Sequence, residues 1–313
     1  MNFDQLKTFH QVAQTGSFTL AARELFLTQP AVSQQIKALE FFLGVTLFDR
    51  SSKQVRLTSE GEILLSYTGR LFHLYDEIDA IFSHMQDLKK GKITIGSTAV
   101  IGTYFLPRII GQYNKRYPGI KLDLKMGNSN TVHSMLADGK IDLCFAGKIR
   151  THSGFAGTLI HRERLLLVVS PENAIATKPT VSVDALINTP FIWREKGTQT
   201  RELVNQWFAK KAGRNYPANS IELHNIEAAK RMAVEGYGIK IVPEISVRRE
   251  MHLGLLKRIT LKGFELTFDY YLFFLKGKIL SKAAEAFLAM VADDKLFSHA
   301  EGLKKQVQTA RRQ

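Results

Sequence analysis

The chain has 313 residues, 45% of them hydrophobic and 23% charged, a length that suits two domains better than one core. No apolar run approaches the ~18 residues of a membrane span. The first residues lack signal-peptide features, and a single cysteine excludes an intramolecular disulfide framework. We therefore expect a cytoplasmic protein with no membrane partner.

The net charge of +14 is spread unevenly along the chain. Residues 1–90 hold nine Lys and Arg against ten Asp and Glu, so the positive excess belongs to residues 91–313. Summed charge governs attraction to anions and to DNA, whereas it says little about fold. An argument for DNA binding by the N-terminal segment must therefore rest on residue pattern.

The first fifty residues predict three short helices. Apolar residues recur every three or four positions from Phe3 onwards and stop at Gly16, a residue that commonly ends helices. Ser17 is the predicted cap of the second helix and Thr28 that of the third. Pro30 then falls in the first turn of the third helix, where its missing N–H costs no hydrogen bond.

The predicted third helix has two distinct faces. At about 100° per residue, Val32, Ile36 and Leu39 form one apolar stripe. Glutamine can pair with adenine, and serine or lysine can reach base edges or phosphates. Most polar helix faces are simply solvated, but we predict that the opposite face contacts DNA through Gln29, Pro30, Ser33, Gln34 and Lys37.

Residues 44–58 predict a short β-hairpin with a basic tip. Arg50, Lys53 and Arg56 follow Asp49 with no further acid among them. Such a wing can lie along the phosphate backbone while the third helix enters the major groove. We therefore predict that these three cations also bind DNA, within a winged helix-turn-helix domain of residues 1–58.

Ordered fragments of this segment resemble the signature of LysR-type transcriptional regulators. Each fragment is weak alone, and the specificity comes from their order and spacing, at residues 16–22, 28–36, 39–40, 43–50 and 57–58. The resemblance implies that the side chains at positions 29, 30, 33 and 34 face DNA. Position 34 is often basic in relatives and is Gln here.

Residues 59–90 predict a long helix with a seven-residue repeat. Two apolar series, offset by three, form a narrow seam of Leu64, Leu71, Ile78 and Met85 together with Tyr67, Leu74, Ile81 and Leu88. Such a seam predicts pairing with the same helix of a second chain; packing on its own core is the alternative. A dimer would place two recognition helices on a two-fold DNA site.

Residues 91–296 alternate predicted strands and helices, as in an α/β domain. The pattern restarts near residue 191, which predicts two lobes with a cleft between them. Strands are expected at residues 93–97, 120–126, 141–146, 165–170, 191–194, 220–224, 239–242 and 266–275, and helices at 102–117, 131–137, 200–212, 227–235 and 281–292. Residues 297–313 are predicted to form a loose basic tail.

Four predicted strand ends supply hydroxyls, backbone amides and a guanidinium, groups suited to a small carboxylate or phosphate. For a single Ser or Thr, a helix cap is the more ordinary explanation. The convergence of four ends favours a ligand site, with Ser97, Thr98, Asn128, Gly147, Thr198, Thr200 and Arg201 as predicted effector contacts.

This second domain resembles the LysR effector domain, which is similar to periplasmic solute-binding proteins. Residues 195–201 are similar to the Glu-x-Gly-Ser/Thr-x-x-Arg run of the branch controlling carbon-fixation and sulfur-assimilation operons, and residues 236–243 to the family's Gly-x-Gly-Ile…Pro passage. The resemblance implies a homodimer or homotetramer that binds a promoter dyad in double-stranded DNA and responds to a small metabolite, and the residues at the strand ends favour an anion as that metabolite. RNA polymerase is a further candidate partner. Effector, operon, and activation or repression stay open.

Two alternatives are an enzyme with a two-lobed cleft and a solute-binding receptor. Against an enzyme, the sequence has no Gly-x-Ser-x-Gly, Walker or His-Glu-x-x-His motif, and Cys144 is expected to be a buried strand residue. Against a receptor stand the missing signal peptide and the first ninety residues. We therefore expect no catalytic residue, no metal and no cofactor.

Overall fold

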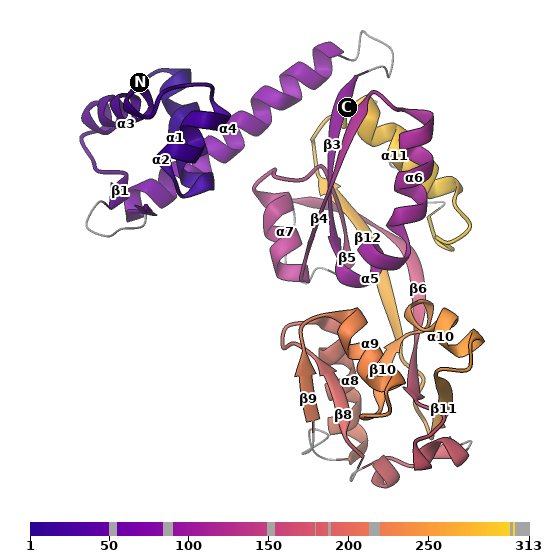
Figure 1. Cartoon of the computed structure of the whole chain (residues 1–313). Helices are drawn as coiled ribbons and strands as arrows, with labels where there is room; N and C mark the ends of the chain where they lie inside the picture. The colour runs from indigo at the N-terminus through magenta and orange to yellow at the C-terminus, as the bar shows by residue number, and fades with distance from the viewer. Residues whose placement is uncertain are drawn as a thin grey trace. The chain divides into compact units, whose positions relative to one another are not determined.

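The computed structural model describes residues 1–49, 55–83, 90–148, 154–178, 180–186, 189–212, 220–300 and 303, with only the backbone at 73, 76, 77 and 79–83. The chain divides into two compact units, an N-terminal unit of Met1–Phe82 and a C-terminal unit holding nearly all later residues (Figure 1). Across these described ranges, no helix combines the length and apolar character needed to cross a membrane.

Capped helices build the N-terminal unit, as the sequence predicts. They are α1 (Phe3–Thr15), α2 (Phe18–Glu24) and α3 (Gln29–Leu43). The Ser17 hydroxyl accepts a hydrogen bond from Leu20 N (3.3 Å), and the Thr28 hydroxyl accepts one from Ala31 N (3.4 Å). Gly16 ends α1 in the left-handed conformation with φ 63°. Both predicted caps are confirmed.

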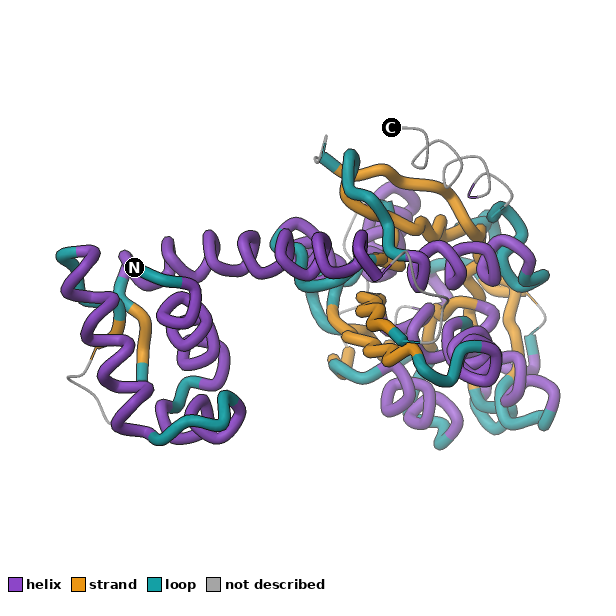
Figure 2. The backbone as a smooth tube through the Cα atoms, turned by 90° about the horizontal axis from the view of Figure 1, so that it is seen from above, coloured by secondary structure: helices purple, strands orange, loops and turns teal. Residues whose placement is uncertain are grey.

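The core of this unit is the apolar side of α3 packed against α1 and α2. Val32, Ile36 and Leu39 are fully buried, as predicted, together with Phe9 of α1. Strands β1 (Phe48–Asp49) and β2 (Arg56–Leu57) pair antiparallel, with residues 50–54 between them outside the described residues. Figure 2 shows that the rest of this unit is almost entirely helical, ending in the long α4 (Ser59–Ser83).

The first lobe of the C-terminal unit has a parallel sheet of β3 (Gly91–Thr98), β4 (Ile120–Gly127) and β5 (Leu143–Gly147). Around the sheet lie α5 (Ala99–Tyr104), α6 (Leu106–Arg116), α7 (Ser129–Ala137) and α11 (Lys282–Asp293) (Figure 1). Parallel pairing brings the carboxyl ends of the three strands to the same edge. Cys144 is buried in β5, as predicted.

The second lobe repeats the α/β arrangement with short strands. Its strands are β7 (Thr180–Val181), β8 (Phe191–Arg194), β9 (Ser220–Leu223), β10 (Lys240–Pro243) and β11 (Lys257–Leu261), and its α-helices are α8 (Gln199–Ala212), α9 (Ile226–Val234) and α10 (Arg248–His252). Short 3₁₀ turns occupy Ala174–Thr177, Asp184–Leu186 and Glu244–Ser246.

Two long strands run through both lobes: β6 (Phe155–Val169) and β12 (Thr267–Leu275). β6 pairs with β12 up to Arg164 and then continues beside β10 and β11. The predicted strand at 165–170 is therefore too short. The missed half carries charges that look unlike a strand in sequence, but pairing satisfies them, as when Arg162 binds Asp269 (2.6 Å).

Two further predictions are wrong. The single helix expected at 102–117 is two helices meeting at Phe105, because α6 starts anew there with proline in its first turn. The tail is not loose where it begins. Phe297, Ala300 and Leu303 are buried in the main core, and the Phe297 ring stacks on Phe105 with centroids 5.5 Å apart.

Candidate functional site

The polar face of α3 is open to solvent. Gln29, Pro30, Gln34 and Lys37 are exposed, whereas Ser33 is partly buried. The Gln29 side-chain amide donates to the Ser33 hydroxyl (2.9 Å), which restrains the glutamine before any partner binds. The first turn of α3 carries no acid, so the positive end of the helix dipole is available to a phosphate.

The wing adds one cation to the described part of this surface. Arg56 is exposed on β2, directly opposite Asp49 of β1. Arg50 and Lys53, the other two predicted wing contacts, lie outside the described residues. The predicted phosphate contacts of the wing therefore rest on Arg56 in this structure.

Helix α4 exposes an apolar stripe. Tyr67, Leu71, Leu74 and Ile78 are 60%, 40%, 57% and 47% exposed, while Leu64 packs partly against the core of its own unit. Met85, Leu88 and the Ile81 side chain lie outside the described residues. A row of large apolar side chains left in water is typical of a surface that a partner covers.

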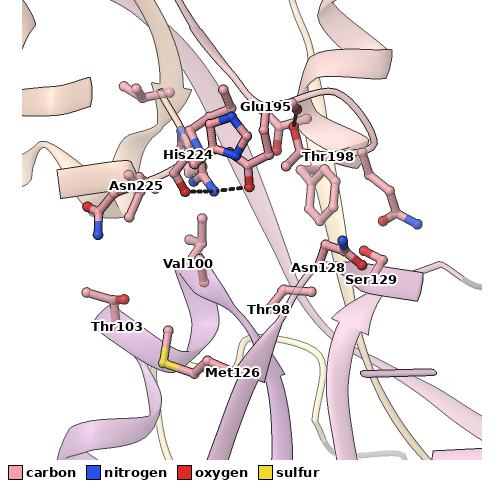
Figure 3. Close-up of a pocket in the computed structure, with 18 of the residues that line it drawn as sticks. Thr98, Val100, Thr103, Met126, Asn128, Ser129, Glu195, Thr198, His224 and Asn225 are labelled. Atoms are coloured by element: carbon pink, nitrogen blue, oxygen red, sulfur yellow. Dashed lines mark hydrogen bonds and ion pairs between the residues drawn. The ribbon is translucent and has the colours of Figure 1, made fainter. Parts of the chain in front are cut away.

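A cavity of about 480 Å³ lies between the two lobes of the C-terminal unit. The first lobe supplies the ends of β3 and β4, and the second supplies the loops after β8 and β9. Figure 3 shows Thr98, Thr103 and Asn128 facing Glu195, Thr198 and His224 across it. Its volume falls within the range of small-molecule sites, about 300–1,000 Å³.

The polar groups of this cavity differ in the hydrogen bonds that they already make within the protein. The Asn128 carboxamide oxygen accepts from Thr131 N (2.9 Å), and the Thr198 hydroxyl donates to Glu195 O (3.0 Å). Thr98 directly precedes α5, yet its side chain makes no capping hydrogen bond. Of the side chains of Thr98, Asn128 and Thr198, the Thr98 hydroxyl is therefore the best placed to bind a ligand.

Three hydrogen bonds join the lobes beside the cavity, and one of them runs from the Lys230 ammonium of α9 to the Tyr104 hydroxyl (3.4 Å). Tyr104 of α5 donates its hydroxyl to the Glu227 carboxylate of α9. The Gln199 side-chain amide, at the start of α8, donates to Lys148 O after β5 (3.0 Å). Burial raises the pKa of Tyr104, and the hydrogen bond to Glu227 adds to this effect. These three contacts link the geometry of the cleft to the relative position of the lobes.

Comparison with known families assigns both units. The profile of the LysR substrate binding domain matches residues 86–295, and that of the bacterial regulatory helix-turn-helix protein, lysR family, matches residues 3–62. The chain belongs to the LysR family of transcriptional regulators. The predicted membership of this family is confirmed, and with it the presence of a DNA-binding helix-turn-helix domain.

Curated relatives of this LysR-type regulator are transcriptional regulators by name, and one of them is named for the RuBisCO operon. The HTH-type transcriptional activator CmpR of Synechocystis sp. is 33% identical over 299 residues, 96% of each chain. The RuBisCO operon transcriptional regulator of Allochromatium vinosum is 28% identical over 295 residues, 94% of this chain and 97% of the relative. Both agree with the predicted regulator branch.

Solved LysR-family structures share the fold. A full-length OxyR variant from Pseudomonas aeruginosa has a TM-score of 0.75 at 18% identity, covering 96% of this chain and 97% of its own. CbnR has a TM-score of 0.67 at 23% identity over 93% and 98%. The Synechocystis PCC6803 CcmR regulatory domain in complex with 2-PG has a TM-score of 0.59 at 24% identity over 64% and 96%. The predicted fold class is confirmed.

The cleft of this LysR-type regulator contains some of the predicted effector contacts. Thr98, Asn128, Thr198 and Thr200 line the cavity. The other three need correction, because Ser97, Gly147 and Arg201 are not among the described lining residues. Ser97 is fully buried and donates to Thr98 O (3.0 Å), and Gly147 is covered by Gln199 and Phe268.

Arg201 holds the second lobe together instead of facing the cleft. Its guanidinium donates to the Glu222 carboxylate of β9 and to Arg194 O of β8, both at 2.6 Å, and stacks 5.3 Å from the Trp193 ring. The sequence prediction treated the charge as available because it could not show that Glu222 lies beside it.

Five charged residues that line the cavity were not among the predicted effector contacts. These are Arg194, Glu195, His224, Glu227 and Lys240. Arg194 directly precedes one of the four predicted strand-end runs, so extending that run by one residue would have found it. His224 closes a predicted strand whose end was not among those four, so including that end would have found it. Lys240 had no such signal, since it lies inside a strand.

Most of these charges are paired. Arg194 binds the adjacent Glu195 through two hydrogen bonds, at 2.6 and 2.7 Å. Burial alone would raise the pKa of Glu195, but its hydrogen bond with Arg194 and the arginine charge lower it. Glu227 likewise has a lowered pKa, because Tyr104 and Lys230 outweigh the effect of burial.

Proposed function

We propose that this LysR-type regulator senses a small anionic metabolite in the cleft and converts its binding into a change of DNA contacts. The observation that carries the proposal is the cavity of about 480 Å³ lined by hydroxyls, amides and a buried ammonium from both lobes. The CcmR regulatory domain, which has the same fold, was solved with 2-PG.

On the DNA side, we propose that Gln29, Ser33 and Gln34 of α3 contact bases, with Pro30 against the duplex and Lys37 near phosphate. The exposure of this face and the open N-terminus of α3 support this division. The basic wing residues would contact backbone phosphates, with Arg50 and Lys53 assigned by sequence alone.

The assembly is proposed to be a homodimer or homotetramer joined through α4. The exposed stripe of Tyr67, Leu71, Leu74 and Ile78 supports pairing with a second copy of the helix. A bound anion can shift the lobes only if its affinity differs between two arrangements. The three hydrogen bonds that join the lobes beside the cleft are the contacts that such a shift would alter.

The test is a DNA-binding titration of the full chain with its own upstream DNA at constant ionic strength. Sulfate, inorganic phosphate, 2-PG and succinate are added in turn, and a scrambled duplex is the control. We expect at least one anion to change affinity or footprint length on the specific duplex alone. If none changes either quantity, anion sensing is wrong.

Several narrower expectations accompany this function and stay predictions. The relatives are transcriptional regulators, which favours a chain without catalytic activity, metal or cofactor, acting in the cytoplasm where its DNA lies. RNA polymerase is a further candidate partner. Chemical conversion of a cleft-binding anion during incubation with the protein would contradict the expectation of no catalysis.

A further inference from the structure

One lysine of the cleft is buried with its charge largely unmatched. Lys240, the first residue of β10, is only 2% exposed and lines the cavity. Its ammonium donates to the carbonyl oxygen of Ile192 in β8 (3.1 Å). An ammonium has three N–H donors, and no second acceptor lies within hydrogen-bond distance in the described parts of the chain.

The backbone before Lys240 fixes this position. A Cβ on Gly238 would lie 2.6 Å from Pro190 O, so the close approach of β10 to β8 requires glycine. Two hydrogen bonds then tie the strands, from Ile239 N to Pro190 O (2.8 Å) and from Ile192 N to Ile239 O (2.9 Å). Lys240 follows directly, and its ammonium is in this way brought to the Ile192 carbonyl of β8.

The neighbouring charges do not neutralise this lysine. Arg194 and Glu195, which line the same cavity, bind each other at 2.6 Å. Glu227 is paired with Lys230 at 2.9 Å. A buried cation without a paired anion is costly to a fold, so a site that retains one is suited to a partner that arrives from solution.

We propose that Lys240 binds the acidic group of the effector, a carboxylate or a phosphate, through the N–H donors that Ile192 leaves unused. This inference rests on the proposed function, because it assigns the counter-charge for the anion that the cleft is proposed to sense. Lys240 thereby selects anions over neutral ligands of similar size.

The assignment makes anion binding dependent on pH. Burial lowers the pKa of Lys240 to about 7, Arg194 adds to the lowering and Glu195 opposes it. Strand β6, paired with β10, presents uncharged Leu167 and Val168 there. Other titratable residues lining the cavity are His224, Glu227 and Tyr270. An anion stabilises the ammonium form, so binding above pH 7 takes up a proton.

Calorimetric titration of the full-length chain with sulfate and with 2-PG tests the assignment. Sulfate keeps its double charge across this range, so its pH dependence reports on the protein. Sulfate affinity should be constant below pH 7 and fall by up to about tenfold per pH unit above it. Heats in buffers of different ionisation enthalpy should show an uptake of about half a proton or more at pH 8.5.

Lys240→Met removes the charge while keeping a long side chain. At pH 6.5 we expect both anions to bind about 30-fold or more weakly, with the proton uptake abolished. The matched control is Lys257→Met in the same lobe, whose ammonium donates to Ala176 O (2.8 Å) outside the cavity lining and which should bind as wild type.

The outcomes separate the two proposals. Wild-type affinity and proton uptake in Lys240→Met would overturn the role of Lys240 and leave anion sensing intact. Failure of both anions to bind the unmodified chain at pH 6.5 would overturn anion sensing and this inference together. If Lys240→Met does not fold by thermal melting, the unmodified chain decides, since no proton uptake at pH 8.5 contradicts the assignment.

Discussion

The DNA-facing helix and the effector cleft are built in opposite ways. The predicted DNA contacts of α3 follow one another along a single face of one helix. The cleft draws its lining from separated segments of two lobes, among them the ends of β3, β4, β8 and β9. A surface on one helix can be derived from periodicity, whereas a cleft depends on which distant charges become neighbours.

In the N-terminal unit, the largest effect is expected from a substitution in the exposed apolar stripe of α4. Leu71→Glu places a charge in the proposed helix–helix seam, where burying it unpaired would cost several kcal/mol, about 3–5. We expect the variant to sediment as a monomer. Ser66→Glu, at an exposed position beside the stripe, is the control and should stay oligomeric. A Leu71→Glu chain that sediments like the unmodified protein contradicts the seam.

For the cleft, the contribution of Lys240 can be tested through the pH dependence of the free energy of unfolding. Its pKa is about 7 when folded, against about 10.4 for an unfolded lysine. The unfolded chain therefore binds more protons between these values, and the free energy of unfolding should rise with pH from 7 to 10. Lys240→Met should lose this rise and be more stable at pH 7, on the order of 1–3 kcal/mol.

Denaturant unfolding at several pH values without added anion checks this expectation. Lys257→Met, which changes an exposed lysine, serves as the control and should keep the pH dependence of the unmodified chain. Parallel pH profiles for Lys240→Met and the unmodified chain would show that the buried lysine titrates normally.

Within the DNA surface, base and phosphate contacts should respond differently. Gln29→Ala should lose discrimination at one base pair, about 1–3 kcal/mol, while binding other sequences nearly as before. Arg56→Ala should weaken binding to all duplexes and reduce the salt slope by about 1. Binding measured across salt concentrations on matched and mutated duplexes separates the two. Identical behaviour of both variants would contradict the proposal that Gln29 contacts a base and Arg56 a phosphate.

The smallest expected effect concerns one hydroxyl of the cleft. Thr98→Val keeps the shape of the side chain and removes a donor that caps no helix. We expect anion affinity to fall by about 0.5–1.5 kcal/mol, with DNA binding in the absence of anion unchanged. Thr177→Val, at an exposed 3₁₀ turn away from the cavity lining, is the control. Equal loss of DNA binding and anion binding would point to a structural role for Thr98.

The sequence predicted features that depend on neighbours along the chain. The caps at Ser17 and Thr28 and the buried stripe of α3 follow from residue order, because helical contacts lie three or four positions apart. The first half of β6 was missed, since its charges are satisfied by residues far away in sequence, as when Arg162 pairs with Asp269 of β12 and Arg164 with Glu244. The start of the tail was missed because its apolar residues pack on Phe105, far away in sequence.

The cleft shows the same limit at single residues. Arg201 looked available until Glu222 of β9 was found beside it. Lys240 directly follows the Gly-x-Gly-Ile motif, which in the sequence indicates only the fold of the effector domain. Its burial comes from the approach of β10 to β8 at Gly238, a tertiary contact. Charge pairing across strands therefore decides which cationic side chains remain for a ligand.

Coupling between anion and DNA is the central claim, and fluorescence anisotropy of a labelled upstream duplex tests it most directly. The full chain is titrated onto the duplex at constant ionic strength, with and without saturating 2-PG or sulfate. We predict specific binding whose affinity shifts with the anion, and no anion-induced shift in Lys240→Met. Tight DNA binding that no anion alters would contradict the coupling, and absence of specific DNA binding at low salt would contradict the regulator itself.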